Sequence, residues 1–568
     1  MCFYIRGNLI YHGKYFEKEE LEKQKNKIKA FLDGWEHEQK EVVALSMKRT
    51  PSLLVTIFAL LEEGIPFLPL DTNLPEERLK YMLDKAEVKT IITDEKKWNE
   101  FCGRTTLCIT EHTNFLEELY QPIRENKMKQ ELAYLLFTSG TTGLPKAVEI
   151  RRKGLKNFVR AIPQIVDFPK ESRIACFTSY TFDIFFLESV MALYEGMTVV
   201  LADEEERSNP RRMQELIRKE KINVIQMTPS ALRMLQMIDE KFTCLNEIET
   251  IMVGGEVFPK QLLKSLQKAV KGRIYNMYGP TETTIWSMVA ELTRAEKVHI
   301  GQPIKDTQIC ILNENLEEVP QGQEGEIGII GIGLARGYRN ELEKTKENFV
   351  FINRNGIKQR VYRTGDYGFL SNTGDYIFCG RKDNQVKILG HRIEIDDIEE
   401  NVIKISGIQN AMVAVYGDDI KRLVCFYVSE DSLNEGILRE KAKKYLPEYM
   451  VPSKWIWVSE LLFTASNKAD RNAMIKRYLK ACNLSNNSAV RTEVEDEIFR
   501  VVKESLGLEK EEIQLADSIE EYVLDSLGYI QLVVAIEDYY NIEFADEMLS
   551  IQYFQNFEEL VDYVAAAI

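Results

Sequence analysis

The sequence predicts an α/β fold in two unequal parts, a large one with stacked sheets and helices and a small one, followed by an all-α module of the four-helix-bundle type. Three observations lead to this prediction. Short apolar runs alternate with amphipathic stretches up to about residue 480, the segment 491–568 has helical periodicity without a strand pattern, and the net negative charge falls in that last segment. A chain of 568 residues is long enough for several domains, each with its own core.

In the large part, apolar runs of strand length are separated by helical stretches. Buried strands are predicted at 42–45, 90–92, 134–137 and 199–201. The stretch 213–219 has the spacing of an amphipathic helix, and the alternation of strands with helices predicts parallel sheets. The longest apolar run, at about 53–61, is too short to span a bilayer and predicts a buried helix.

A smaller unit from 383 to 478 repeats the alternation, with strands predicted at 411–415 and 423–427. The polar stretch 483–488 lacks apolar period and helix-forming bias, so it predicts a linker. Beyond it, apolar side chains recur at four-residue steps, as in an amphipathic helix, at Val494, Ile498, Val502 and Leu506. We therefore expect a large subdomain at 1–382, a small subdomain at 383–480, a linker at 481–490 and a helical module at 491–568.

Charge divides the chain into a neutral body and an acidic module. The net charge is −16, and residues 491–568 contain 20 Asp and Glu against 4 Lys and Arg. Because the whole chain has 89 Asp and Glu against 73 Lys and Arg, the rest of it is neutral. An acidic module is suited to basic protein surfaces rather than to nucleic acid.

Nine cysteines, an odd number, stand at wide spacings with no Cys-x-x-Cys pair. This pattern argues against a zinc site or a disulfide framework and favours a reducing compartment. The first residues contain no apolar stretch long enough for a signal peptide, and no membrane span is predicted. We expect a cytoplasmic protein.

Residues 138–146 form a candidate phosphate-binding loop after the apolar run 134–137. Its first six residues contain four hydroxyls and two glycines, so the backbone can approach an anion while N–H and O–H groups point at it. The Gly-Lys-Ser/Thr ending of a Walker A loop is absent. The glycines alone are equally compatible with an ordinary polar surface turn.

Near the carboxyl end, Asp525 and Ser526 stand at the start of a short amphipathic helix, with Leu527, Ile530 and Val534 on one face. An Asp-Ser pair at such a place most often only caps the helix. Within an acidic helical module, it also suits a serine that carries a covalent cofactor.

The string at 138–146 resembles the phosphate loop of the adenylate-forming superfamily. Other segments are similar, in the same order, to motifs of that superfamily and more narrowly to those of the amino-acid adenylation domains of nonribosomal peptide synthetases. These segments are 67–71, 182–183, 276–282, 331–338, 362–366, 380–388 and 446–452. The resemblance covers nearly the whole chain through Arg471, and it implies ATP-dependent activation of an amino acid as aminoacyl-AMP.

An ATP site is implied by this resemblance. Joining a carboxylate to the α-phosphorus brings anions together at a cost of about 4 kcal/mol per charge pair at an effective dielectric of about 20, so cations must offset the repulsion. The resemblance assigns Mg²⁺ binding to Glu282 and the α-phosphate contact to Thr281. It places Tyr278 and Asn276 against adenine, and Asp366 at the ribose. The implied ATP-binding residues are Thr138, Ser139, Gly140, Thr141, Thr142, Gly143, Lys146, Gly255, Asn276, Tyr278, Thr281, Asp366 and Arg381.

A late lysine, Lys468, is similar to the catalytic lysine that bridges the acid carboxylate and ATP. The family usually has Asn-Gly before this lysine, whereas this chain has Ser466 and Asn467. Asparagine adopts left-handed backbone more readily than most residues, so the turn is compatible with this sequence. Asp383 matches the hinge acid between the two subdomains. The resemblance implies that the small subdomain presents Lys468 for adenylation and then swings away for thioester transfer.

Asp183 precedes an apolar run, where a lone acid is unfavourable unless it is paired. In the family, this position pairs with the α-ammonium group of the substrate, which implies an α-amino acid. The other implied pocket residues are Ile184, Leu187, Gln226, Met252, Gly254, Met277, Ile285 and Trp286. Large side chains at Met252, Met277 and Trp286 resemble glycine-selecting domains, since steric exclusion suits the smallest substrate. Apolar members such as Ile184 are equally suited to an ordinary core.

The Leu-Asp-Ser-Leu string around Ser526 resembles acyl and peptidyl carrier proteins, in which the serine carries 4′-phosphopantetheine. It departs from the Gly-Gly-His-Ser form common in peptidyl carriers and is closer to the acyl or D-alanyl carrier type. The implied partners are a small amino-acid substrate, a phosphopantetheinyl transferase, and a condensation or other acyl-accepting enzyme in trans.

Two other functions stay open. An acid:CoA ligase of the same superfamily would share the ATP motifs, although Asp183 and the covalent carrier argue against it. A catalytically inactive scaffold that presents an acidic carrier is the second, and intact Lys468, Glu282 and Asp366 argue against it.

Overall fold

The computed structural model covers most of the chain in two compact units. It describes residues 3–34, 41–71, 74–94, 100–101, 103–109, 131–138, 144–354, 356–381, 385–388, 391–417, 421–462, 469–479, 499–500, 502, 518–522, 526–540, 544, 548, 553–554 and 556–567. The first unit contains residues 1–140, 144–233 and 241–392. The second contains residues 141–143, 234–240 and 393–568.

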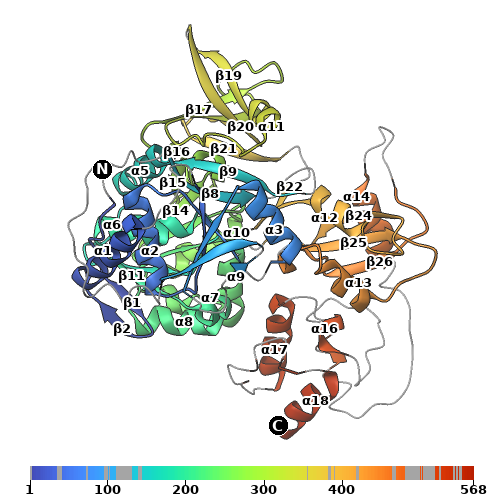
Figure 1. The fold of residues 1–568 in the computed structure, drawn as a ribbon. Coiled ribbons are helices and arrows are strands. Elements are labelled where there is room, and N and C mark those ends of the chain that lie inside the picture. Colours follow the sequence, from blue (N-terminus) through green and yellow to red (C-terminus); the bar gives the residue numbers. More distant parts are fainter. Residues whose placement is uncertain are drawn as a thin grey trace. The chain divides into compact units, whose positions relative to one another are not determined.

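The first unit is built on a nine-stranded sheet (Figure 1). Across the described residues its order is β16 (Gln302–Pro303), β15 (Met288–Glu291), β14 (Arg273–Tyr278), β13 (Thr250–Gly254), β12 (Val224–Met227), β10 (Arg173–Cys176), β11 (Thr198–Leu201), β1 (Leu9–Tyr11) and β2 (Lys14–Phe16). The strands from β14 to β1 are parallel, and β15, β16 and β2 are antiparallel to their neighbours. The parallel strands are almost wholly buried, as expected for strands covered on both faces.

A second sheet of the first unit has seven described strands and is also mainly parallel. Its order is β6 (Glu100–Phe101), β7 (Arg104–Cys108), β5 (Thr90–Thr93), β3 (Val43–Ser46), β4 (Phe67–Pro69), β8 (Leu132–Thr138) and β9 (Lys146–Arg151). The pair of β8 and β9 is antiparallel, and Thr138 and Lys146, the first and last residues of the candidate phosphate loop, are direct partners in it.

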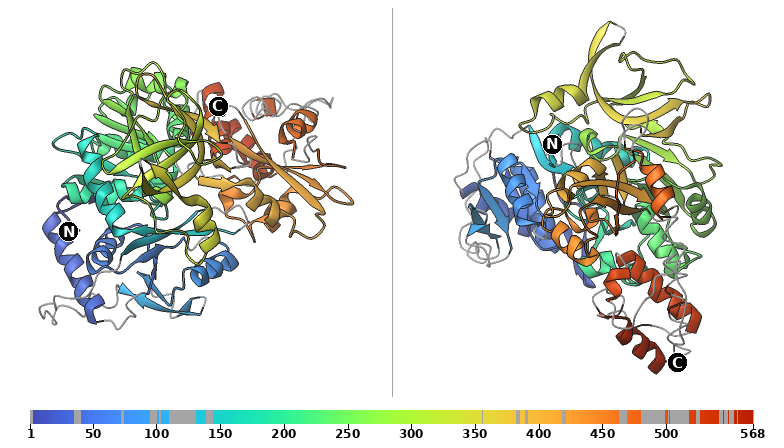
Figure 2. Two further views of the ribbon diagram at one scale, coloured as in Figure 1. Left: turned by 90° about the horizontal axis from the view of Figure 1, so that it is seen from above. Right: turned by 90° about the vertical axis from the view of Figure 1, so that its right-hand side faces the viewer.

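The third sheet of this unit is antiparallel, with five strands described. It contains β17 (Thr307–Leu312), β18 (Gly325–Gly331), β20 (Ile357–Leu370) and β19 (Phe349–Arg354), and β21 (Tyr376–Arg381) also pairs with β20. Figure 2 shows these strands, in yellow, as one twisted layer. The sequence pattern did not foresee this sheet, because its strands carry short, interrupted apolar runs.

Helices surround the sheets of the first unit. Those described are α1 (Lys18–Gly34), α2 (Pro51–Glu63), α3 (Glu76–Lys85), α5 (Arg152–Ala161), η2 (Ile162–Gln164), η3 (Leu187–Met191), α6 (Ala192–Glu195), α7 (Glu204–Ser208), α8 (Pro210–Lys219), α9 (Pro229–Ile238, whose last residues fall in the second unit), η4 (Thr243–Leu245), α10 (Lys260–Ala269), η5 (Thr281–Thr283) and α11 (Leu342–Asn348). Helix α2 has local start and stop signals: Pro51 begins it, and Gly64, in left-handed backbone at φ 80°, ends it with an N–H bond to Leu60. Its apolar residues lie in one core with residues of both parallel sheets.

In the second unit, a small sheet comes first along the chain. It contains β24 (Asn410–Tyr416), β25 (Arg422–Val428) and β26 (Lys454–Trp457). The helical segments near it in sequence are α12 (Ile395–Val402), α13 (Glu435–Ala442), η6 (Glu448–Met450), α14 (Arg471–Met474) and η7 (Ile475–Leu479). The strands β22 (Gln385–Ile388), of the first unit, and β23 (His391–Glu394), which begins in it, pair with each other and precede α12 in sequence.

The end of the chain is helical, with α16 (Ile519–Tyr522), α17 (Ser526–Tyr540) and α18 (Phe557–Ala567). Figure 1 shows these helices in red. They share a core of their own, in which Tyr529 and Val533 of α17 join Phe557 and Leu560 of α18. Ser526 is the first residue of α17, as the sequence predicts.

Most sequence-predicted elements are confirmed. The predicted strands correspond to β3, β5, β8, β11, β24 and β25, and the predicted helices at 53–61 and 213–219 lie within α2 and α8. The linker at 481–490 lies outside the described residues, and the domain boundaries stay predictions. Among the described helices, none is both long enough and apolar enough to cross a membrane.

Glu62, near the end of α2, holds two lysines of α1 in a nearly buried cluster. Its carboxylate lies 2.7 Å from Lys25 Nζ and 2.5 Å from Lys29 Nζ, and Lys25 is almost wholly buried. Burial raises the pKa of Glu62, but the hydrogen bonds from both lysines outweigh it and place that pKa below its ordinary value of 4.5.

We therefore expect Glu62→Gln to lower the free energy of unfolding by about 3 kcal/mol, because the nearly buried Lys25 and Lys29 each lose one of two carboxylate partners. A depressed pKa stabilises the folded state above 4.5 and loses this contribution as pH falls below it, so the difference from the unmutated protein should shrink in acid. Melting temperatures at neutral and acid pH measure this. Glu63→Gln, at a carboxylate 3.4 Å from Lys29, serves as the control and should have a smaller effect.

Candidate functional site

The candidate site lies where the parallel strands of the nine-stranded sheet end. Asp183 follows β10, Gln226 lies in β12, Gly255 follows β13, and Tyr278 is the last residue of β14. Because these strands are parallel, their carboxyl ends meet at one edge, which is where open α/β sheets bind ligands. Strand pairing thus brings together residues that are up to about a hundred positions apart in sequence.

At this edge, Asp366 is held by two donors. The Tyr278 hydroxyl donates to Oδ2 at 2.5 Å, and Arg381 Nη1 donates to Oδ1 at 2.6 Å. Asp366 and Arg381 are direct partners across β20 and β21. Burial raises the pKa of Tyr278 well above its ordinary value, and the Asp366 charge adds to this, so the hydroxyl stays a donor. The nearby amide of Asn276 donates to the His299 carbonyl at 2.8 Å.

Glu282, in η5, is fully buried and carries a stabilised negative charge. The Tyr338 hydroxyl donates to its Oε1 at 2.9 Å, and Arg392 Nη1 lies 3.0 Å from Oε2 and 3.2 Å from Oε1. Burial raises the pKa of Glu282, but the Arg392 guanidinium outweighs it, with help from the Tyr338 hydroxyl and the Lys146 ammonium, and the pKa lies below its ordinary value. An ionised carboxylate of this kind fits a hard divalent cation, and Arg392 holds the same oxygens here.

Arg392 and Tyr338 were not predicted as site residues. Arg392 stands four residues beyond the motif at 380–388, and Tyr338 ends the motif at 331–338. The position of Arg392 just after a matched motif was the only sequence signal for it. Its ion pair with Glu282 could not be predicted from the sequence.

The phosphate-loop candidates are anchored on both sides by strands. Thr138 ends β8 and is the direct partner of Lys146, which begins β9 and is buried. The buried Oγ1 of Thr138 has no hydrogen-bond partner within the described part of the chain, so it is available to a bound group. The predicted residues outside the described ranges are Ser139, Gly140, Thr141, Thr142, Gly143, Asp383 and Lys468.

Asp183 is partly buried, with a hydroxyl and a cation near it. Burial raises the pKa of Asp183 above its ordinary value, while a hydrogen bond with Thr281 and the charge of Lys387 oppose the rise. Burial also lowers the pKa of Lys387. A further cation beside Asp183 would favour its ionised form, as an ammonium group does.

The predicted pocket residues beyond Asp183 are all buried and close together in the first unit. Gln226 pairs with Met252 across β12 and β13, and Gly254 pairs with Met277 across β13 and β14. A Cβ built on Gly254 would lie 2.7 Å from the Met277 carbonyl oxygen and 2.8 Å from Cη2 of Trp286. Glycine is therefore required at 254, because the indole already occupies the space above it.

The backbone before Trp286 is strained. Thr284 and Ile285 both have φ of 69°, in the left-handed region, where a β-branched residue such as Ile285 is an outlier. Such residues cost about 1–3 kcal/mol each and persist where the surroundings hold them in place. Here the turn directs Trp286 inward, and the indole N–H donates to Gln226 Oε1 at 3.1 Å.

With this geometry described, comparison with known proteins gives the family. The AMP-binding enzyme family matches residues 7–339, and a phosphopantetheine attachment site matches residues 496–564. The chain belongs to the AMP-binding enzyme family. Within it, the chain has the domain order of the nonribosomal peptide synthetase type, an adenylation domain followed by a carrier domain.

Its relatives include large multidomain synthetases. The dimodular nonribosomal peptide synthase of Bacillus subtilis (strain 168) is 34% identical over 482 residues, or 82% of this chain. The chain spans only 20% of that relative's length.

Two solved structures are similar over 99% of this chain. One is holo-PA1221, a nonribosomal peptide synthetase protein with adenylation and PCP domains bound to a vinylsulfonamide inhibitor. Its TM-score is 0.83 at 22% identity, and 94% of its chain is covered. At this identity the similarity shows the fold alone. Holo-AB3403, a four-domain synthetase bound to AMP and glycine, has a TM-score of 0.61 at 29% identity and is covered to 42%.

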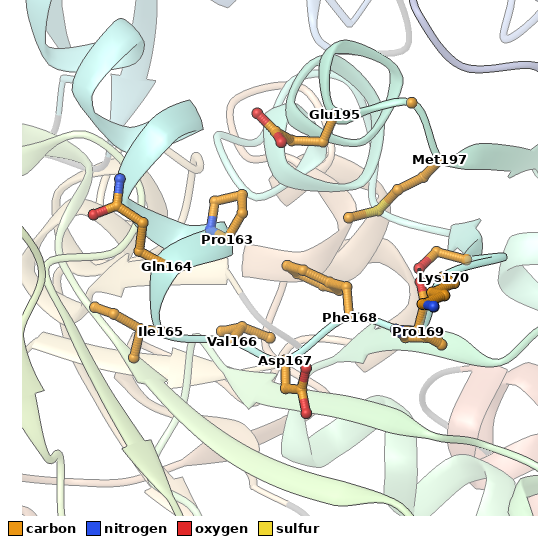
Figure 3. A pocket seen from close by; sticks show the side chains of 12 residues that line it. Pro163, Gln164, Ile165, Val166, Asp167, Phe168, Pro169, Lys170, Glu195 and Met197 are labelled. Atoms are coloured by element: carbon orange, nitrogen blue, oxygen red, sulfur yellow. Dashed lines mark hydrogen bonds between the residues drawn. The ribbon is translucent and has the colours of Figure 1, made fainter.

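The first unit also has a hollow of about 340 Å³ away from this site (Figure 3). It is lined by residues 163–170, which precede β10, and by Glu195–Met197, which precede β11, with the Phe168 ring in the middle of the lining. These segments lie at the amino ends of the parallel strands, opposite the carboxyl-end site.

We expect Gly254→Ala to be poorly tolerated. Its Cβ would come closer to the Met277 carbonyl than real Cβ atoms do, and that carbonyl is fixed by the β13–β14 pairing. Overpacking of this kind destabilises by about 1–3 kcal/mol, which a melting curve measures. Gly322→Ala is the matched control, because its Cβ would meet nothing within 4 Å and it tests backbone strain alone. Equal melting temperatures for the two variants would contradict the packing around Gly254.

Proposed function

We propose that this ligase activates a small α-amino acid, with glycine favoured, and loads it onto its own carrier domain. The carboxylate oxygen attacks the α-phosphorus of ATP and pyrophosphate leaves. Ser526 would hold a 4′-phosphopantetheine group, whose thiol would supply the nucleophile that takes the aminoacyl group from AMP. The packing around Gly254 supports the choice of substrate most directly, because Trp286 and Met277 fill the volume that a larger side chain would need.

In this proposal, Asp183 pairs with the α-ammonium group of the substrate. Its environment suits that role, because burial disfavours the carboxylate and an added cation restores it. Holo-AB3403, which is 29% identical and similar over nearly all of this chain, is bound to glycine, and this supports glycine as the proposed substrate.

For ATP, we assign Asp366 to the ribose hydroxyls and Tyr278 to adenine. Arg381 and the Tyr278 hydroxyl fix the Asp366 carboxylate, which keeps free lone pairs as an acceptor. Thr138 and Lys146 flank the phosphate loop, and the open hydroxyl of Thr138 is suited to a phosphate oxygen. Lys468 and Asp383 keep their proposed roles as catalytic lysine and hinge.

We assign Mg²⁺ to Glu282. The ion would supply positive charge to the phosphate oxygens, where carboxylate and phosphate meet. Arg392 must leave the Glu282 oxygens for the ion to bind there, since both contact the same atoms.

We assign Ser526 as the attachment point of 4′-phosphopantetheine, whose thiol accepts the aminoacyl group. Its place at the start of α17, within the segment that matches the phosphopantetheine attachment site, supports this role. A phosphopantetheinyl transferase would modify it, and a condensation or other acyl-accepting enzyme in trans would take the product. The described cysteines are free thiols, which agrees with a cytoplasmic enzyme.

An amino-acid panel in a pyrophosphate-exchange assay tests the substrate. We expect glycine first, with alanine and serine as weak seconds, because a misfit in a preformed pocket costs about 1–3 kcal/mol, or roughly tenfold to a hundredfold in selectivity. Trp286→Ala should raise exchange with alanine relative to glycine. A preference of the unmutated enzyme for a bulky amino acid would rule out the glycine assignment and leave the reaction class standing.

Carrier loading is tested separately by intact-mass measurement after treatment with a phosphopantetheinyl transferase and CoA. We expect Ser526→Ala to take no adduct while pyrophosphate exchange stays near that of the unmutated enzyme, because adenylation precedes loading. Ser550→Ala, at another serine of the same module, should still be modified. An adduct that persists on the Ser526 variant would place the cofactor elsewhere.

A further inference from the structure

Glu188 is a fully buried carboxylate next to the candidate pocket, and no role has been given to it above. It lies in the π-helix η3, one residue after Leu187. A buried carboxylate is unfavourable unless hydrogen bonds compensate it. Thr178 provides two, from its backbone N–H to Oε2 at 2.8 Å and from its hydroxyl to Oε1 at 2.5 Å. The amide nitrogen Nε2 of Gln226 lies 3.5 Å from the same Oε1.

Gln226 connects Glu188 with Trp286. The Gln226 amide has one end that donates and one that accepts. Its NH₂ group faces Glu188, so its oxygen faces the indole N–H of Trp286, at 3.1 Å. Turning the amide over would set its oxygen against the carboxylate and its NH₂ against the indole N–H, and both contacts would then be repulsive. The carboxylate therefore fixes the direction of the amide, and the amide fixes the indole.

The other end of this chain of contacts is also fixed. Arg49 donates to the carbonyls of Thr178 at 2.6 Å and Ala202 at 2.5 Å, and to the carbonyl of Cys176 at the end of β10. Thr178 thus has a set position relative to the sheet, and Glu188 accepts from both of its donors. Thr178 lies in the loop that continues to Phe182 and Asp183. The position of Asp183 and, through Glu188 and Gln226, that of the Trp286 indole therefore depend on the same anchored loop.

We propose that Glu188 is a positioning residue for substrate size: by orienting Gln226, it holds the Trp286 indole over Gly254 and excludes side chains larger than that of glycine. This inference rests on the proposed function, because it concerns the selectivity of that same pocket. Glu188 does not contact the substrate in this account. Its effect passes through Gln226 and Trp286.

The test compares kcat/KM for glycine and alanine in pyrophosphate exchange by the full chain. Burial raises the pKa of Glu188 to about 7, and its hydrogen bonds from Thr178 oppose the rise, so assays at about pH 8 keep the carboxylate ionised. Glu188→Gln keeps the shape but offers the Gln226 amide both a donor and an acceptor, which permits either orientation. We expect the glycine-to-alanine ratio to fall about fivefold, the effect of losing one buried hydrogen bond, mainly through a higher KM for glycine and a lower one for alanine.

A second arm places the same change in a Trp286→Ala background. If Glu188 acts through the indole, Glu188→Gln should leave the ratio of that background unchanged, so the two substitutions are not additive. Glu62→Gln is the matched control: it makes the same chemical change at a buried carboxylate in another part of the first unit and should leave the ratio unchanged despite its lower stability.

An unchanged ratio in Glu188→Gln, or an equal change with and without Trp286, would overturn the proposal. Where Glu188→Gln does not fold, Thr178→Val removes the hydroxyl donor to Oε1 and should shift the ratio in the same direction by a smaller factor. A panel in which the unmutated enzyme prefers a larger amino acid would refute the glycine assignment instead. In that case, the ratio of kcat/KM for the preferred amino acid to kcat/KM for the next larger one tests Glu188: it should fall in Glu188→Gln if Glu188 sets the size limit.

Discussion

The register between β13 and β14 is the constraint on which the candidate pocket depends. Gly254 and Met277 are direct partners in this parallel pair, and Met252 and Tyr275 are partners two residues earlier. Because side chains alternate along a strand, a slip of one residue would turn this set to the other face of the sheet. The position of Trp286 then follows, since its indole packs where Gly254 has no side chain. The strained turn at Thr284 and Ile285 precedes Trp286, and the Thr284 hydroxyl holds it by donating to the Gly333 carbonyl at 2.6 Å.

Buried charges of the first unit are arranged in pairs around this pocket. Asp366 meets Arg381 across two antiparallel strands, and Glu282 meets Arg392 at the end of the unit. Each carboxylate would be unfavourable alone, because removing an ion from water costs several kcal/mol. Pairing offsets this cost at the site where, in the proposed reaction, phosphate, ammonium and metal charges would arrive. The contact of Arg392 with Glu282 also means that a guanidinium and a divalent cation would compete for one carboxylate.

The carrier segment differs from the rest of the chain in charge and has a hydrophobic core of its own. Its aromatic core of Phe499, Tyr529, Phe544 and Phe557 is formed among its own helices. The acidic residues that give the chain its net charge of −16 lie in the same segment. A surface of one sign favours encounters with basic partners and accelerates them. That property agrees with the proposed role of the segment as a carrier of an acyl group between enzymes.

The sequence by itself determined the local elements and the family. Apolar periodicity set the buried strands β3, β5 and β11 and the amphipathic helices, because each pattern repeats over a few neighbouring residues. Asp183, Tyr278 and Asp366 could be named as site residues because they stand in contiguous motifs. Lys468, Asp383 and the inner loop residues could be named in the same way, and they lie outside the described residues.

Only the tertiary structure decided how these residues are held. The antiparallel sheet of β17 to β21 depends on pairings between apolar runs that are short and interrupted. The local pattern of apolar residues therefore does not predict it. Arg392 and Glu282 are 110 residues apart, and the contacts from Glu188 to Gln226 and from Gln226 to Trp286 span 38 and 60 residues. Hydrogen bonds and ion pairs require approach within a few ångströms, and that approach comes from strand order and register. A linear sequence displays residue types and their spacing, but the partner of a buried charge is settled only when the chain has folded.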